Sequence, residues 1–261
     1  MKILTIILIL LAVSTPSFAT EMKILTENYP PFNYEKDGEI KGAITSIVKQ
    51  LMKEIGWNQD IKLLSWNKAY SLIENNSGYI LYSMALNEKR KQKFKWVGPL
   101  LFIDGYYYQK RNSNKNWTTI EDIKQNALVG VRENSNAHKS LITEGYQHVV
   151  PLESPEAYYR GLYYGRIDII ISSPWNIPFR VKKFDLPHDA FERTPVPAGQ
   201  GKLYIAFSRD TPDEILQLWQ RKLDALKTTP QYQEIFDDAI REVSDDFNVD
   251  FDLPVYHFVK D

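Results

Sequence analysis

The sequence predicts an α/β protein of two lobes joined by two crossings of the chain. Segments with strand character alternate with segments whose apolar residues repeat at helical spacing, which is typical of sheets covered by helices. The alternation stops at 100–112, where apolar and aromatic residues lead into a polar stretch. It resumes after a segment rich in Pro and Gly at 191–200. We therefore expect both ends of the chain to build one lobe and the middle to build the other.

Residues 1–19 have the three parts of a secretory signal peptide. Met1-Lys2 precedes an apolar run over 3–13, and the segment 14–19 ends in small residues. The run is shorter than the roughly 20 apolar residues that a membrane-spanning helix needs. We expect cleavage after Ala19 and a soluble, periplasmic protein. The chain has no cysteine, so we expect a free monomer without disulfides or a lipid-modified cysteine.

Composition argues against several classes of function. The 32 basic and 33 acidic residues nearly balance, to a net charge of −1, which gives no electrostatic reason to expect nucleic acid or a membrane surface as partner. The sequence has neither a phosphate-binding glycine motif nor a G-x-S-x-G elbow. Its four histidines form no local pair of metal ligands. We expect no cofactor, no metal and no catalysis.

The first lobe begins with a strand at 23–26 and the proline-stiffened turn 27–32. Asp37-Gly38 indicates a hairpin. Apolar residues then repeat along one helix face from Gly42 to Gly56. The expected elements that follow are a strand at 61–64, a helix over 68–74 that starts at 65–67, and a strand at 79–82.

The second lobe repeats this order, and the chain then returns to the first. Ser154-Pro155-Glu156 is a strong helix start, because serine caps and proline fits the first helical position. The other elements expected are a helix from Thr119 to Lys124, strands at 128–131, 148–152, 167–171 and 203–207, and helices from 211 and from 230 to near Ile240. We place the first lobe at 20–106 and 200–240, the second at 107–199, and a C-terminal tail at 241–261.

The stretch 82–99 has the strongest functional pattern. A short apolar run that ends in Ser83 leads into the charged turn Asn87-Glu88-Lys89-Arg90. The alternative is a solvated basic loop, since four of the six residues at 88–93 are lysine or arginine.

Three short motifs in order make the sequence similar to the extracellular solute-binding proteins of family 3, the amino-acid-binding components of bacterial ABC transporters. They are E-N-Y-P-P-F at 27–32, N-E-K-R at 87–90 and G-R-I-D-I-I-I-S-S at 165–173. The resemblance covers about residues 22–240. It implies a type II periplasmic-binding-protein fold, in which two lobes close on a ligand.

The resemblance also implies which residues bind. Arg90 would hold a ligand carboxylate, Tyr29 would form an aromatic wall, and Trp66 would face the cleft. The position that usually grips an α-amino group with an acid is Ser173 in this sequence, so Glu27 or Glu133 would have to meet an amine. The remaining candidates are Ser83, Ala85, Arg132, Ser135 and Asn136.

Two of these assignments have open alternatives. Ser135 and Asn136 could donate hydrogen bonds to an anion at a helix start, or could simply cap that helix. Arg132 would make the cleft more positive beside Arg90, unless it points to solvent as most arginines do.

The expected function is capture of a small carboxylate-bearing solute, an amino acid or a relative, for ABC-type uptake through a permease. One alternative is a soluble sensory module that presents its closed form to a membrane receptor. Another is an enzyme like cyclohexadienyl dehydratase on the same fold, which the missing acid at Ser173 disfavours.

The tail 241–261 lies beyond the resemblance. Its alternate acids begin like a calcium loop, but Phe251 replaces the required glycine and His257 the final glutamate. We expect this acidic tail to pack back on a lobe through its aromatic residues.

Overall fold

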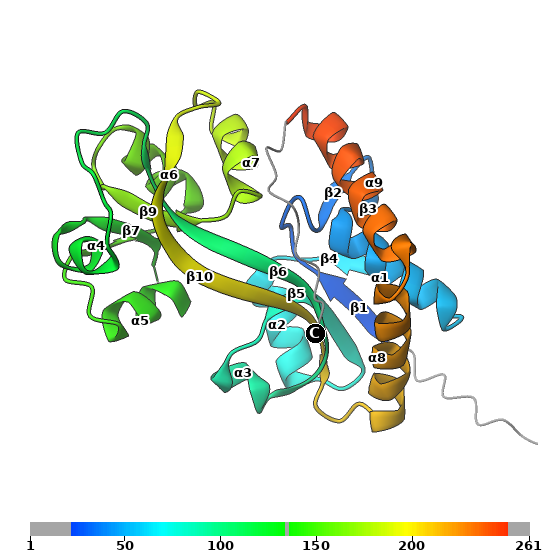
Figure 1. The fold of residues 1–261 in the computed structure, drawn as a ribbon. Helices are drawn as coiled ribbons and strands as arrows, with labels where there is room; N and C mark the ends of the chain where they lie inside the picture. Colours follow the sequence, from blue (N-terminus) through cyan, green and yellow to red (C-terminus); the bar gives the residue numbers. More distant parts are fainter. Residues whose placement is uncertain (1–21, 134–135, 250–261) are drawn as a thin grey trace, which may run out of the picture.

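One eight-stranded sheet runs through the molecule in the computed structural model, which describes residues 22–133 and 136–249. Two long antiparallel strands, β6 (Phe94–Lys110) and β10 (Phe191–Ser208), lie in the middle of this sheet and extend through both halves. Figure 1 shows helices gathered around each end of this pair. The predicted α/β fold with two lobes and two crossings is confirmed.

The first lobe is built around three parallel strands, β4, β1 and β5. Residues of α1, α8 and α9 share its larger hydrophobic core, whereas α2 packs in a separate core with residues of β1 and β5. Both layers are needed because strands of this kind are apolar on both faces. The bounds are β1 (Lys23–Thr26), β2 (Tyr34–Lys36), β3 (Glu39–Lys41), α1 (Ala43–Glu54), β4 (Ile61–Leu63), α2 (Trp66–Asn75), β5 (Tyr79–Ala85), α3 (Glu88–Lys91), α8 (Asp213–Lys227) and α9 (Pro230–Phe247).

The second lobe has the parallel strands β9, β7 and β8, and β9 pairs antiparallel with β6. The predicted caps are present: the Ser154 hydroxyl accepts from Ala157 N–H at 3.2 Å, and the Thr119 hydroxyl accepts from Asp122 N–H at 3.2 Å. The bounds are α4 (Ile120–Asn126), β7 (Val129–Arg132), α5 (Asn136–Thr143), β8 (Val149–Leu152), α6 (Pro155–Tyr163), β9 (Ile169–Ser172) and α7 (Asn176–Lys183).

The expected end of the last helix near Ile240 is wrong, since α9 continues through Phe247. Asp246 is held there by Tyr34, whose hydroxyl donates to Asp246 Oδ2 at 2.8 Å, and by Lys36, whose Nζ lies 2.6 Å from Asp246 Oδ1. These contacts with the β2–β3 hairpin stabilise a helix end that is rich in Ser and Asp, which are poor helix formers. The beginning of the expected tail is therefore helical, while its residues 250–261 lie outside the described part.

Trp175 joins the two lobes. It stands between β9 and α7, both of the second lobe, yet it belongs to the hydrophobic core of the first. Its ring centroid lies 5.7 Å from that of Phe32 and 5.6 Å from that of Phe236. The side chain is only 5% exposed, so its burial contributes to the contact between the lobes.

Within the two described stretches, no helix combines the length and apolarity required to cross a membrane.

Candidate functional site

The candidate site centres on Glu27, which follows β1 directly. Its backbone carbonyl accepts a hydrogen bond from Asn33 Nδ2 at 2.5 Å. Burial raises the pKa of its carboxyl to about 7, although the charges of Arg132, Arg90 and Arg180 lower it. Three arginines therefore lie close enough to act on one carboxylate, with Arg90 on the first lobe and the other two on the second. The site spans both lobes and has more positive than negative groups.

Arg90 is held in a defined orientation by several contacts. It lies on the short helix α3, where the side chain of Asn87 accepts its backbone N–H at 2.9 Å. Its Nη1 donates to the carbonyl of Ala85 at 2.9 Å. Its guanidinium carbon is 4.9 Å from the ring centre of Trp66 and 5.6 Å from that of Tyr70. This stacking fixes the planar group in place and leaves donors for a carboxylate.

In the basic stretch after β5, Arg90 faces the candidate site, whereas its neighbouring lysines are exposed to solvent. Burial lowers the pKa of Arg90, whereas Lys89 and Lys91 are exposed on the same helix. The interpretation as a solvated loop fits the lysines, and the interpretation as a ligand contact fits Arg90. Because Arg90 is already partly desolvated, a ligand carboxylate would interact with it more strongly than in water.

Tyr29 extends the site from the first lobe to α7. Burial, the largest effect, raises the pKa of its hydroxyl, and a hydrogen bond with the side chain of Asn176 lowers it. Charges on Arg180 and Tyr158 also act on this hydroxyl. Tyr29 therefore lies close to residues of α6 and α7 in the second lobe.

Two predicted serines have structural partners. Ser83 is 4% exposed and its hydroxyl donates to Asn33 Oδ1 at 2.5 Å. Ser173 is 3% exposed, and its hydroxyl accepts from the backbone N–H of Asn176 at 3.3 Å. Ser83 thus supports the loop that carries Glu27, and Ser173 accepts a hydrogen bond from the first residue of α7.

The remaining candidates have mixed positions. Ala85 is exposed and takes part through its carbonyl, as described above. Arg132 is exposed at the end of β7, with its charge acting on Glu27. Glu133, the other candidate for an amine, is also exposed. Asn136 begins α5, and Ser135 lies outside the described residues.

Sequence reasoning missed Tyr70, Tyr158, Asn176 and Arg180. Tyr70 could have been found, because it lies four residues after Trp66 on one helix face. Tyr158 falls in a predicted helix, but nothing in the pattern separates it from a core tyrosine. The other two lie on α7, a helix that was not predicted from the sequence. In the part of the chain that the structure describes, no group of three or more His, Cys, Asp or Glu residues could hold a metal ion.

Two lobes around a sheet with two crossings, and a cationic site between them, define the class of two-lobe solute-binding proteins. The chain belongs to the bacterial extracellular solute-binding proteins of family 3, whose family model matches residues 22–242. A curated relative is the probable amino-acid-binding protein YxeM of Bacillus subtilis, 22% identical over 161 residues. That match covers 60% of this chain and spans only 60% of the relative's length.

Solved structures at low identity share the fold. A histidine kinase sensor domain with similarity to periplasmic binding proteins has a TM-score of 0.71 at 17% identity, covering 84% of this chain and 96% of that one. The amino acid ABC transporter substrate-binding protein AbpA from Streptococcus pneumoniae, bound to L-arginine, has a TM-score of 0.68 at 16% identity, covering 85% of this chain and 95% of that one. The GluR0 ligand-binding core from Nostoc punctiforme, bound to L-glutamate, has a TM-score of 0.66 at 17% identity, covering 83% of this chain and 98% of that one.

The pKa of Glu27 leads to a testable pH dependence. The folded protein holds the Glu27 proton up to about pH 7, whereas an ordinary glutamate releases it near 4.5. The contribution of this group to the free energy of unfolding is therefore present below pH 4.5 and is lost as the pH rises through about 7. Urea unfolding at pH 5 and pH 8 should show the wild type losing stability relative to Glu27→Gln.

Glu133→Gln is the matched control, because Glu133 is an exposed acid near the same site. This variant should follow the wild type at both pH values. Parallel pH dependence in the wild type and Glu27→Gln would contradict the shifted pKa.

Proposed function

We propose that this protein captures a small solute with a carboxylate and a net negative charge, an amino acid or a close relative, between its two lobes. The observation that carries the proposal is that the charges of Arg90, on the first lobe, and of Arg132 and Arg180, on the second, all act on Glu27. These three guanidinium groups act on a carboxyl group whose pKa is raised to about 7, so a ligand carboxylate between the lobes would be attracted by their positive charge. An anionic ligand is therefore favoured over a cationic one.

Each part of the site has a distinct task in this proposal. Arg90 holds a carboxylate from the first lobe, and Trp66 and Tyr70 keep its guanidinium in place. Arg132 and Arg180 meet the ligand from the second lobe, and Tyr29 covers it. A ligand that touches arginines on both lobes stabilises the closed arrangement, because only that arrangement provides all the contacts.

Glu27 is the group that would bind the amine of an amino-acid ligand. The ionised carboxylate pairs with an ammonium group, and the ammonium in turn favours ionisation. Glu27 would therefore take the role of the acidic residue that is missing at position 173, where this chain has Ser173. For a ligand without an amine, protonated Glu27 removes repulsion and donates a hydrogen bond.

The relatives support an amino-acid-like ligand. YxeM is named a probable amino-acid-binding protein, and two of the similar structures hold L-arginine and L-glutamate. The excess of arginines in this chain favours an acidic compound such as glutamate over a cationic one, because a second cation would meet repulsion.

We further propose export through a cleaved signal peptide and delivery of the solute to an ABC permease. A sensory role is the second candidate, favoured by the similarity to a histidine kinase sensor domain. Catalysis of the dehydratase type is disfavoured, since Ser173 is buried and provides no acid. Pull-down with the candidate permease and with receptor ectodomains would separate the first two roles.

A thermal-shift screen tests the ligand class. The compounds are L-glutamate, L-aspartate, succinate, L-glutamine, L-alanine, L-arginine and L-lysine. A ligand at 100 times its dissociation constant adds about 2.7 kcal/mol to the free energy of unfolding. We expect L-glutamate, L-aspartate or succinate to raise the melting temperature most. Stabilisation by L-arginine or L-lysine alone would overturn the charge argument, and no response to any carboxylate would overturn the proposed function.

A further inference from the structure

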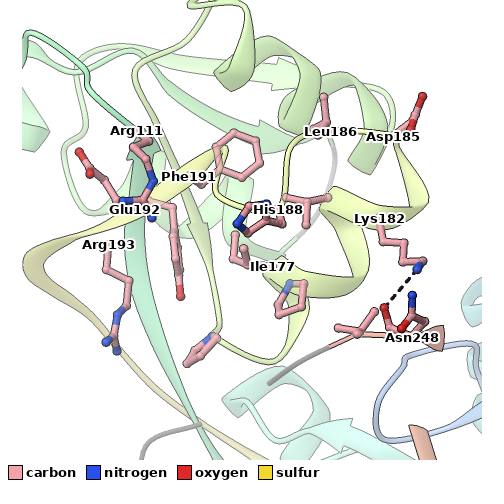
Figure 2. Close-up of a pocket in the computed structure, with 15 residues that line it drawn as sticks. Arg111, Ile177, Lys182, Asp185, Leu186, His188, Phe191, Glu192, Arg193 and Asn248 are labelled. Carbon is pink, nitrogen blue, oxygen red and sulfur yellow. Dashed lines mark hydrogen bonds between the residues drawn. The ribbon is translucent and has the colours of Figure 1, made fainter. Parts of the chain in front are cut away.

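A cavity of about 810 Å³ lies on the second lobe beside α7. Its apolar lining includes Ile177, Val181, Leu186 and Phe191, and Arg111, Lys182 and Arg193 carry positive charge at its edge. Figure 2 shows Lys182 and Asn248 at one end, Arg193 towards the other, and Ile177 and His188 between them. None of the candidate ligand residues around Glu27 lines this cavity, which we call the α7 groove.

The C-terminal segment leads directly to the α7 groove. The helix α9 packs against α1 in the first lobe, but the ring of Phe247 in its last turn lies 4.9 Å from that of Phe179 on α7. Lys182 Nζ then donates to the carbonyl of Asn248 at 3.1 Å. Val249 is 8% exposed and lines the groove itself. The chain has therefore crossed from the first lobe to the second where the described residues end.

The sequence that follows complements the groove. Residues 250–261 read D-F-D-L-P-V-Y-H-F-V-K-D, with several large apolar side chains, three aspartates and one lysine. The groove is lined by the three cations named above and two acids, Asp185 and Glu192. Fully extended, twelve residues could reach about 40 Å, so length does not limit access. The family match ends at residue 242, so this segment belongs to this chain rather than to the family pattern.

We propose that residues 250–261 dock in the α7 groove and act as a strap between the lobes. The anchors on the first lobe are α9 and its contacts with the β2–β3 hairpin. The anchors on the second lobe are the apolar lining of the groove and its positive edge. Apolar burial drives docking, and the aspartates are attracted by the cations Arg111, Lys182 and Arg193 of the lining. The strap stabilises the contact between the lobes without using the ligand site.

Hydrogen–deuterium exchange on the ligand-free protein tests the strap, so the test does not depend on the proposed function. Three forms are compared: the full chain, a chain ending at Val249, and the full chain carrying Phe251→Asp, Val255→Asp and Phe258→Asp. His257→Gln is the control, because it changes the same segment without removing an apolar side chain. We expect amides at 177–193 to exchange several-fold faster in the shortened and triple-substituted forms, and at the wild-type rate in the control.

A synthetic peptide of residues 250–261, added to the shortened chain, should restore the slow exchange. Unchanged exchange at 177–193 after truncation would overturn the proposal. Protection that falls on dilution of the full chain, with light scattering showing a dimer, would assign the groove to a second copy and would also overturn it.

Discussion

Arg90→Ala is expected to weaken binding of the ligand identified by the thermal-shift screen by about 2–5 kcal/mol, which is typical when one partner of a desolvated charge pair is removed. This corresponds to a loss of affinity of about 30-fold to a few thousand-fold. The effect is large because the guanidinium is partly buried against Trp66 and Tyr70 and is already oriented by the carbonyl of Ala85. Isothermal titration calorimetry at one pH measures it.

Two further variants separate charge from geometry. Lys91→Ala removes an exposed cation from the same short helix and should leave affinity near the wild-type value. Arg90→Lys keeps the charge but loses the planar fork and its stacking, so its affinity should fall between those of the wild type and Arg90→Ala. Wild-type affinity in Arg90→Ala would end the carboxylate model.

Trp175→Ala is expected to lower the free energy of unfolding by about 3–5 kcal/mol, the usual cost of truncating a buried tryptophan. It should also separate the lobes, because Trp175 is the side chain that the second lobe inserts between Phe32 and Phe236 of the first. Small-angle scattering should show a larger radius of gyration than for the wild type. Ligand should reduce that radius again if binding closes the lobes.

Trp219→Ala is the matched control for this experiment. Trp219 is fully buried in the core of the first lobe, with its ring 5.5 Å from Trp57 and 5.7 Å from Phe207. Its truncation should destabilise the protein by a similar amount without changing the radius of the folded form. Equal radii for Trp175→Ala and the wild type would show that Trp175 does not hold the lobes together.

The sequence by itself determined the elements that rest on local signals. The strand at Lys23–Thr26, the hairpin at Asp37-Gly38 and the helix after Ser154-Pro155 stand where they were predicted. Their causes act within a few residues: alternation, turn geometry and capping. Arg90 was also within reach of the sequence, because it follows a strand in a charged turn with a recognisable motif.

Only the tertiary structure decided which side chains meet across the cleft. Arg180 and Asn176 lie on α7, where Pro178 interrupts any simple helical pattern, and their partners Glu27 and Tyr29 come from about 150 residues earlier in the sequence. No local signal can report a contact of that separation. The same holds for Trp175, whose neighbours belong to the other lobe.

The end of α9 shows why local sequence preference and the folded structure can disagree. The residues Ser244-Asp245-Asp246 have low helix propensity, so the sequence predicts an earlier end. Tyr34 and Lys36 bind Asp246, and Phe247 packs against Phe179 of the other lobe. These contacts add more stability than the weak local preference removes, and only the folded arrangement of distant segments provides them.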